Sequence, residues 1–354
     1  MEKWIAPSYY RTFSCKADRC RHTCCRYWRI PISKDEYMRM ITMECSEDLN
    51  RRIHRAFEEP DFLSNECYRY VSFNWMGDCP VNDNGLCALH REKGEGYLPK
   101  TCRLYPRSLK KVNGQLRACC SSSCEKVVEM LYEPDGFTLE EIELDEKPNV
   151  SYEIDGNAIE ELSKFTVLLQ DRSTSLAASI KDICLIINQE EFNKDETSDS
   201  NPLDETLTLF SRLVRNDTYL SEIVKPIIER YKKDRDLYFK DRDRFEKHFE
   251  VWMPFFENVI NNSMFYENFP FVDKRFDRTN AYKGLCVTYG ILRIATIGHT
   301  AINGYTKDNL VDATAAIFHL IDHTSFYYNV SIVINGAAKF ITLKKDSSLG
   351  RIFF

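Results

Sequence analysis

Cysteine is concentrated in the first third of this 354-residue chain. Twelve of the fourteen cysteines lie between Cys15 and Cys124, and the 230 residues that follow hold only Cys184 and Cys286. Such a density is typical of a disulfide framework or of a metal or iron-sulfur site, and the choice depends on redox compartment and chain length. A chain this long can bury enough apolar surface to fold without disulfides. The cysteines therefore favour a metal or cluster site.

Two features that the sequence lacks indicate in which cellular compartment the protein is found. The N-terminal segment has no apolar stretch followed by a small-residue cleavage site, so we expect no secretory signal. No window approaches eighteen consecutive apolar residues, which predicts that the protein has no transmembrane helix. Both features indicate a cytoplasmic protein, and reducing conditions there disfavour structural disulfides.

The net charge of the chain changes sign near the end of the cysteine-rich region. Residues 1–132 carry 22 Lys and Arg against 17 Asp and Glu, a net charge of +5, whereas the remaining residues carry −11. The overall charge of −6 argues against general nucleic-acid binding. Residues 133–157 combine proline, glycine and many acidic residues, as linkers do. We therefore expect a mostly α protein, with a small cysteine-rich α+β module at 1–132, a linker at 133–157 and an α-helical domain at 158–354.

Local patterns support this division. Ser33-Lys34-Asp35-Glu36 and Ser122-Ser123-Cys124-Glu125 match capping boxes, in which serine and glutamate satisfy free amide groups where a helix begins. Asn113-Gly114 is flanked by the segments 109–112 and 115–118 and predicts a β-hairpin with a type I′ turn. Helical periodicity in the second half predicts helices at 158–171, 176–192, 203–215, 219–233, 237–269 with a kink at Pro254, 278–299 and 307–323.

Several familiar site types have no support. The chain contains no dinucleotide-binding Gly-x-Gly-x-x-Gly and no phosphate-binding loop. A radical enzyme of the S-adenosylmethionine type would continue Cys20-x3-Cys24 with a cysteine where Tyr27 stands. Cys20-x3-Cys24 and Cys120-x3-Cys124 could together bind one zinc ion, whereas an iron-sulfur cluster takes four thiolates at looser spacings. Spacing alone leaves both centres open.

The order of cysteines and their neighbours resembles one enzyme family. The matching residues are Pro7-x-Tyr9, Phe13-x-Cys15-x4-Cys20-x2-Thr23-Cys24-Cys25-x2-Trp28-x-Ile30, Cys79, Gly85-x-Cys87-x-Leu89 and Leu98-x3-Cys102-Arg103-x-Tyr105-Pro106-Arg107. This pattern resembles the flagellin lysine N-methylase family, and the cysteine module is similar to small zinc- or iron-chelating proteins. The match is specific over residues 1–125 and diffuse afterwards.

The resemblance implies an enzyme that methylates the ε-amino groups of flagellin lysines. It further implies S-adenosylmethionine as the methyl donor, a [4Fe-4S] cluster, with zinc as the alternative, and flagellin as the partner. Carried over by position, the metal-binding candidates are Cys15, Cys20, Cys24, Cys25, Cys79, Cys87 and Cys102. Cys119, Cys120 and Cys124 match less securely.

Methyl transfer to lysine suggests further candidates. The amine must lose its proton before it attacks, and a cationic sulfonium is favoured by aromatic faces. Tyr105 beside Cys102 is the first candidate for lining such a site, with Tyr27 and Trp28 behind it. Arg103 and Arg107 could bind the carboxylate of the cofactor. The alternative is that these side chains only pack around the cluster.

Two other functions compete. One is a non-enzymatic zinc or iron-sulfur binding module on a helical protein-interaction domain, and the other is a dithiol redox protein. The roughly 200 residues after the cysteine module argue against a bare chelating protein. The absence of Cys-x-x-Cys ranks the redox protein last.

Overall fold

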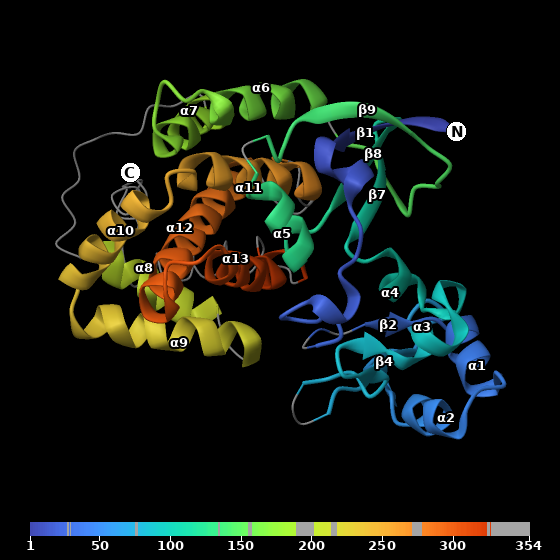
Figure 1. The fold of residues 1–354 in the computed structure, drawn as a ribbon. Coiled ribbons are helices and arrows are strands. Elements are labelled where there is room, and N and C mark those ends of the chain that lie inside the picture. The colour runs from blue at the N-terminus through green and yellow to red at the C-terminus, as the bar shows by residue number, and fades with distance from the viewer. Residues whose placement is uncertain are drawn as a thin grey trace. The chain divides into compact units, whose positions relative to one another are not determined.

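The computed structural model describes residues 1–26, 28, 30–74, 77–133, 135–154, 158–188, 202–213, 218–270, 278–323 and 326. The chain forms two units, each of which we describe by itself (Figure 1). Ser14–Arg107 form one, here called the cysteine unit; Met1–Phe13 and Ser108–Phe354 form the other, here called the helical unit. Helices dominate the described part of the chain, as the sequence predicts.

The boundaries between the units differ from those expected. The sequence places one boundary near residue 132 and a linker at 133–157, whereas the structure divides the chain after Phe13 and after Arg107. The reason is that the first residues form a strand, β1 (Glu2–Pro7), whose partners come from β8 (Gln115–Cys120) and β9 (Leu139–Leu144). Strand β9 and the short β10 (Val150–Tyr152) occupy the expected linker.

The sheet of the helical unit has five strands in the order β10-β7-β8-β1-β9. Strand β7 (Arg107–Val112) and β8 form the predicted hairpin, because Asn113 and Gly114 both adopt the positive φ that a type I′ turn requires. β1 runs parallel to β8 and antiparallel to β9, with Ile5 opposite Arg117 and Trp4 opposite Ile142. Trp4 and Ala6 are fully buried, so alternate residues of β1 face the core.

Helices make up the rest of the helical unit. After the 3-10 turn Ser8–Thr12 and α5 (Glu125–Leu131), they are α6 (Ala158–Gln170), α7 (Leu176–Asn188), α8 (Pro202–Leu213), α9 (Thr218–Lys233), α10 (Asp236–His248), α11 (Trp252–Glu267), α12 (Arg278–Asn303) and α13 (Lys307–Asp322). Six of the seven predicted helical segments are confirmed within a few residues at the described ends. The segment at 237–269 is broken rather than kinked: Pro254 lies in the first turn of α11, where its missing N–H leaves no hydrogen bond unmade.

Aromatic side chains fill the core of the helical unit. The rings of Phe245 and Phe256 stack with centroids 6.1 Å apart, and both residues are fully buried. The stretch Ala281–Asn303 of α12 is long and apolar enough to span a membrane, but most of its apolar part is buried inside the structure. The core helix of a soluble protein has the same property.

The cysteine unit contains short elements. They are the 3-10 turn Ala17–Arg19, β2 (Pro31–Ile32), α1 (Lys34–Thr42), α2 (Glu47–His54), β3 (Phe57–Glu58), β4 (Arg69–Val71), β5 (Asn82–Asp83), β6 (Leu86–Cys87), α3 (Ala88–Lys93), the 3-10 turn Glu95–Tyr97 and α4 (Lys100–Leu104). Three of the strands form a sheet in the order β2-β4-β3, and β5 pairs with β6 in a second sheet. The capping box at Ser33 is confirmed: its hydroxyl accepts from the N–H of Glu36, whose carboxylate accepts from the N–H of Ser33.

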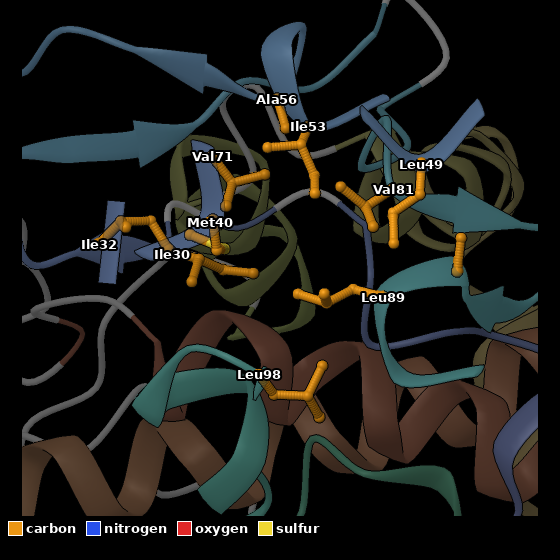
Figure 2. Packing of buried hydrophobic residues seen from close by; sticks show 11 residues of the cluster. Ile30, Ile32, Met40, Leu49, Ile53, Ala56, Val71, Val81, Leu89 and Leu98 are labelled. Atoms are coloured by element: carbon orange, nitrogen blue, oxygen red, sulfur yellow. The ribbon is translucent and has the colours of Figure 1, made fainter. Parts of the chain in front are cut away.

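Aliphatic side chains form the core of the cysteine unit (Figure 2). Met40 from α1, Leu49 and Ile53 from α2, Val71 from β4 and Leu89 from α3 gather there. Cys79, Cys87 and Cys102 are partly buried and pack against this core. The apolar core therefore supports three of the predicted metal-binding residues.

Candidate functional site

Four of the seven predicted metal-binding cysteines lie together in the cysteine unit. The thiols of Cys25, Cys79, Cys87 and Cys102 are close enough for their charges to interact. Burial and the other three thiols raise the pKa of Cys102 well above its ordinary value. Burial followed by the charge of Cys25 raises the pKa of Cys79 to about 12. A positively charged centre among these sulfurs would relieve both penalties, because it favours the thiolate form.

A hairpin positions two of these cysteines. Cys79 precedes β5 and Cys87 ends β6, where it pairs with Asn82. The turn between the strands holds Asn84 and Gly85, both with positive φ, so the two strands fold back within two residues. The N–H of Cys79 donates to the carbonyl oxygen of Cys25 at 2.9 Å. The backbone thus links the Cys25 loop to the hairpin.

Helix α4 carries the fourth thiol, that of Cys102, and Glu36 anchors the helix. The carboxylate of Glu36 accepts from the N–H of Lys100, the first residue of α4, at 2.6 Å, as well as from Ser33. Burial raises the pKa of Glu36, but these hydrogen bonds outweigh burial and hold it below its ordinary value. The capping box of α1 therefore also fixes the position of Cys102.

Cys25 differs from the other three thiols. A hydrogen bond with Cys24 outweighs burial and lowers the pKa of Cys25 to about 7, with help from Thr23. Cys24 and Cys15 are exposed and Cys20 is half-buried. Cys119, Cys120 and Cys124 belong to the helical unit, where Cys119 and Cys120 are buried in β8. The described geometry thus sets Cys25, Cys79, Cys87 and Cys102 apart from the remaining candidates.

Among the described residues, no group of three or more His, Cys, Asp or Glu side chains is placed to hold a metal ion. The four thiols are therefore identified as a group by the interaction of their charges, and the described side chains do not by themselves form a metal-ion site.

Among the predicted cofactor-binding and catalytic residues, Arg103 lies in α4 and Tyr105 directly follows that helix. The rings of Trp28 and Tyr105 are 5.4 Å apart and tilted by 41°, and the indole N–H of Trp28 donates to the carbonyl oxygen of Cys24. Arg103 is exposed and Arg107 is half-buried at the start of β7. Tyr27 lies outside the described residues. The aromatic pair thus adjoins the loop that carries the cysteines.

A pocket of about 530 Å³ elsewhere in the cysteine unit involves none of these candidates. Arginines of α2 and residues after β4 line it, namely Asp48, Arg51, Arg52, Arg55, Ser72, Phe73, Asn74 and Pro80. Arg52 is paired with Asp48 and Asp83, which leaves it less able to bind an anionic ligand.

The helical unit holds a polar cluster that the sequence analysis missed. The predicted capping box at Ser122 is wrong: the residue preceding α5 is Cys124, and no side chain caps that helix. Ser121 and Ser123 instead bond to Asp322 and His323 at the end of α13, about 200 residues later in the chain. No local pattern links positions so far apart, so only the fold reveals them.

Comparisons with known proteins identify the family. A model of the FliB lysine N-methylase C-terminal domain matches residues 144–335, more than half of the chain. A lysine-N-methylase of Salmonella typhimurium is 26% identical over 141 residues, which cover 38% of this chain and 34% of that protein. A lysine-N-methylase of Salmonella choleraesuis is 24% identical over 141 residues, which again cover 38% of this chain and 34% of that protein. The alignments thus span about a third of these curated relatives.

No solved structure matches the chain significantly. The family model lies entirely after the cysteine unit, so it supports the predicted resemblance independently of the cysteine pattern. The chain belongs to the FliB lysine N-methylase family.

Proposed function

We propose that this protein is a protein-lysine N-methyltransferase that transfers methyl groups from S-adenosylmethionine to flagellin lysines. The observation that carries the proposal is the match of residues 144–335 to the FliB lysine N-methylase C-terminal domain. The two lysine-N-methylases of Salmonella support the same reaction class. A non-enzymatic zinc or iron-sulfur module is less favoured, because the match lies in the helical part and not in the cysteine unit.

We propose in addition that four cysteines hold a [4Fe-4S] cluster. Of the seven candidates, Cys25, Cys79, Cys87 and Cys102 are the strongest, because their thiols interact and three of them rest on the aliphatic core. When bound, such a cluster supplies a centre that accepts or donates single electrons. The residues of this chain hold it in place through the β5-β6 hairpin and through the anchoring of α4 by Glu36.

The methyl donor would bind beside this centre. Its sulfonium is a cation, and the faces of Trp28 and Tyr105 offer the quadrupole that attracts cations. Arg103, which is exposed, would bind its carboxylate, with Arg107 nearby in sequence. Flagellin would be met in the cytoplasm before its export.

The test is methyl transfer to purified flagellin. Protein prepared without oxygen is incubated with S-adenosylmethionine and flagellin, and mass spectrometry locates methylated lysines. We expect methylation by the wild type and its loss in Cys102→Ser, whereas Cys45→Ser retains it because Cys45 only packs against the core. Unmodified flagellin under all conditions would contradict the proposed substrate.

A further inference from the structure

Three arginines at the end of α2 line the pocket of about 530 Å³ in the cysteine unit. Arg51, Arg52 and Arg55 bring three positive charges and Asp48 brings one negative charge, so the lining side chains carry a net charge of +2. The C-terminus of a helix attracts cations by itself, and the charges alone therefore do not define a site. The pocket adds a volume that is typical of small-molecule sites.

Hydrogen bonds fix the segment after β4, which forms another wall of the pocket. The N–H of Ser72 donates to the carbonyl oxygen of Ala56, just after α2, at 2.8 Å. The N–H of Asn74 donates to the carbonyl oxygen of Asp78, whose own N–H donates to the side-chain oxygen of Asn74. Phe73 is half-buried and packs against the aliphatic core. This wall thus offers apolar surface beside polar groups.

Arg52 is already bound within the protein. Its Nε donates to Asp48 at 2.7 Å, one terminal nitrogen donates to the carbonyl oxygen of Asn82 at 3.1 Å, and the other lies 3.3 Å from the carboxylate of Asp83. Asn82 and Asp83 form β5, so Arg52 joins α2 to the hairpin that ends in Cys87. Arg52 therefore shapes the pocket but has little capacity left for a ligand.

Arg51 and Arg55 remain able to bind an anion. Arg51 lies 3.4 Å from Asp48, and because these side chains are 63% and 55% exposed, water competes with the pair. Arg55 is exposed, and among the described residues no group accepts a hydrogen bond from its guanidinium or forms an ion pair with it. The two arginines are four positions apart on helical backbone, so their side chains project to the same side.

We propose that this pocket binds a small organic anion, with Arg51 and Arg55 on its carboxylate or phosphate group and Phe73 against its apolar part. A guanidinium presents paired N–H groups whose geometry matches both kinds of anion. All lining residues belong to the cysteine unit, and none is a candidate for the methyl donor or the metal centre. The pocket is therefore a separate site, which does not depend on the proposed methyl transfer.

The test is isothermal titration calorimetry of the whole protein, purified without oxygen, with phenyl phosphate, benzoate and the neutral benzyl alcohol. We expect at least one anion to bind and benzyl alcohol to bind much more weakly. Arg55→Gln and Arg51→Gln should each weaken binding of that anion about tenfold, because each removes a charged donor. Arg39→Gln is the control, since it removes an exposed arginine of α1 that does not line the pocket. The tighter anion distinguishes a phosphate ligand from a carboxylate ligand.

Hydrogen exchange locates the bound probe. The tighter anion should slow amide exchange in α2 and at residues 77–83, and Arg55→Gln should lose this protection at the same concentration of the probe. No binding of either anion at millimolar concentration would overturn the assignment, as would benzyl alcohol binding as tightly as the anions. Equal weakening by Arg39→Gln and Arg55→Gln would also overturn it, because it would indicate attraction by net charge alone, and so would protection confined to other segments.

Discussion

Different kinds of interaction stabilise the two units. In the helical unit, large aromatic side chains such as Phe245 and Phe256 are fully buried between long helices. In the cysteine unit, helices of five to nine residues surround an aliphatic core, and turns, caps and a two-residue hairpin strand hold the remaining chain. Apolar burial stabilises the first, whereas the second depends more on directed hydrogen bonds and, under our proposal, on its metal centre.

The two units also differ in how easily residues of interest can be recognised from the sequence alone. Thiols stand out in the sequence because cysteine is rare elsewhere in the chain. Asp322, by contrast, is one of 54 acidic residues, and its contact with Ser121 becomes recognisable only in the folded structure.

The largest effect is expected from Phe256→Ala. The Phe256 ring stacks on Phe245 and lies 6.3 Å from the ring of Tyr289 on α12, so its removal leaves a cavity. We expect the free energy of unfolding of the helical unit to fall by about 3–5 kcal/mol, measured by urea denaturation followed by circular dichroism. Phe239→Ala, at a position that is 47% exposed, is the control. Equal losses for both variants would show that packing does not dominate this unit.

A smaller effect is expected from Gly298→Ala in α12. A Cβ atom at this position would lie 2.5 Å from Cγ2 of Ile227 on α9, closer than carbon atoms approach. Overpacking should cost about 1–3 kcal/mol, although alanine favours a helix by about 1 kcal/mol over glycine. Ile227→Ala removes Cγ1 and Cγ2, the two nearest atoms, and leaves only Cβ at 3.2 Å, so in that background Gly298→Ala should destabilise much less. A cost that persists in the double variant would place its origin elsewhere.

The smallest effect is expected from Glu36→Gln in the cysteine unit. The loss of a charged acceptor for Ser33 and Lys100 should lower the free energy of unfolding by about 1–2 kcal/mol at pH 7. Because the folded-state pKa of Glu36 is depressed, its contribution is present above about pH 4.5 and is lost as pH falls through the folded value.

Asp35→Asn is the control for this change, since it removes an exposed acid from the same helical turn. Thermal unfolding at pH 7 and at pH 3 gives the comparison. A difference between Glu36→Gln and the wild type that is as large at pH 3 as at pH 7 would contradict the role of the carboxylate.

Local signals predicted most elements but not the domain boundaries. Helical periodicity located the helices, and Asn113-Gly114 and Ser33-x-x-Glu36 specified a turn and a cap that the structure contains. Whether β1 pairs with strands close to it in the chain or with β8 and β9 depends on contacts across more than 100 residues. No local pattern encodes such contacts.

The sequence indicated which cysteines to consider but not which of them come together in the fold. The resemblance supplied seven cysteines, and folding brings Cys25, Cys79, Cys87 and Cys102 into mutual electrostatic contact. Ser122 matched a capping box, yet its hydroxyl accepts from Asn262 of α11 instead, because the helix begins later than the pattern indicates. A tertiary contact outweighs a local one at this position.

Iron and sulfide content tests the central claim most directly. The wild type and Cys102→Ser are purified without oxygen and analysed together with their absorption spectra. We predict about four iron and four sulfide per wild-type chain, and less than half of that content in Cys102→Ser. Stoichiometric zinc without sulfide in the wild type, or a full iron content in Cys102→Ser, would contradict a four-iron cluster held by these thiols.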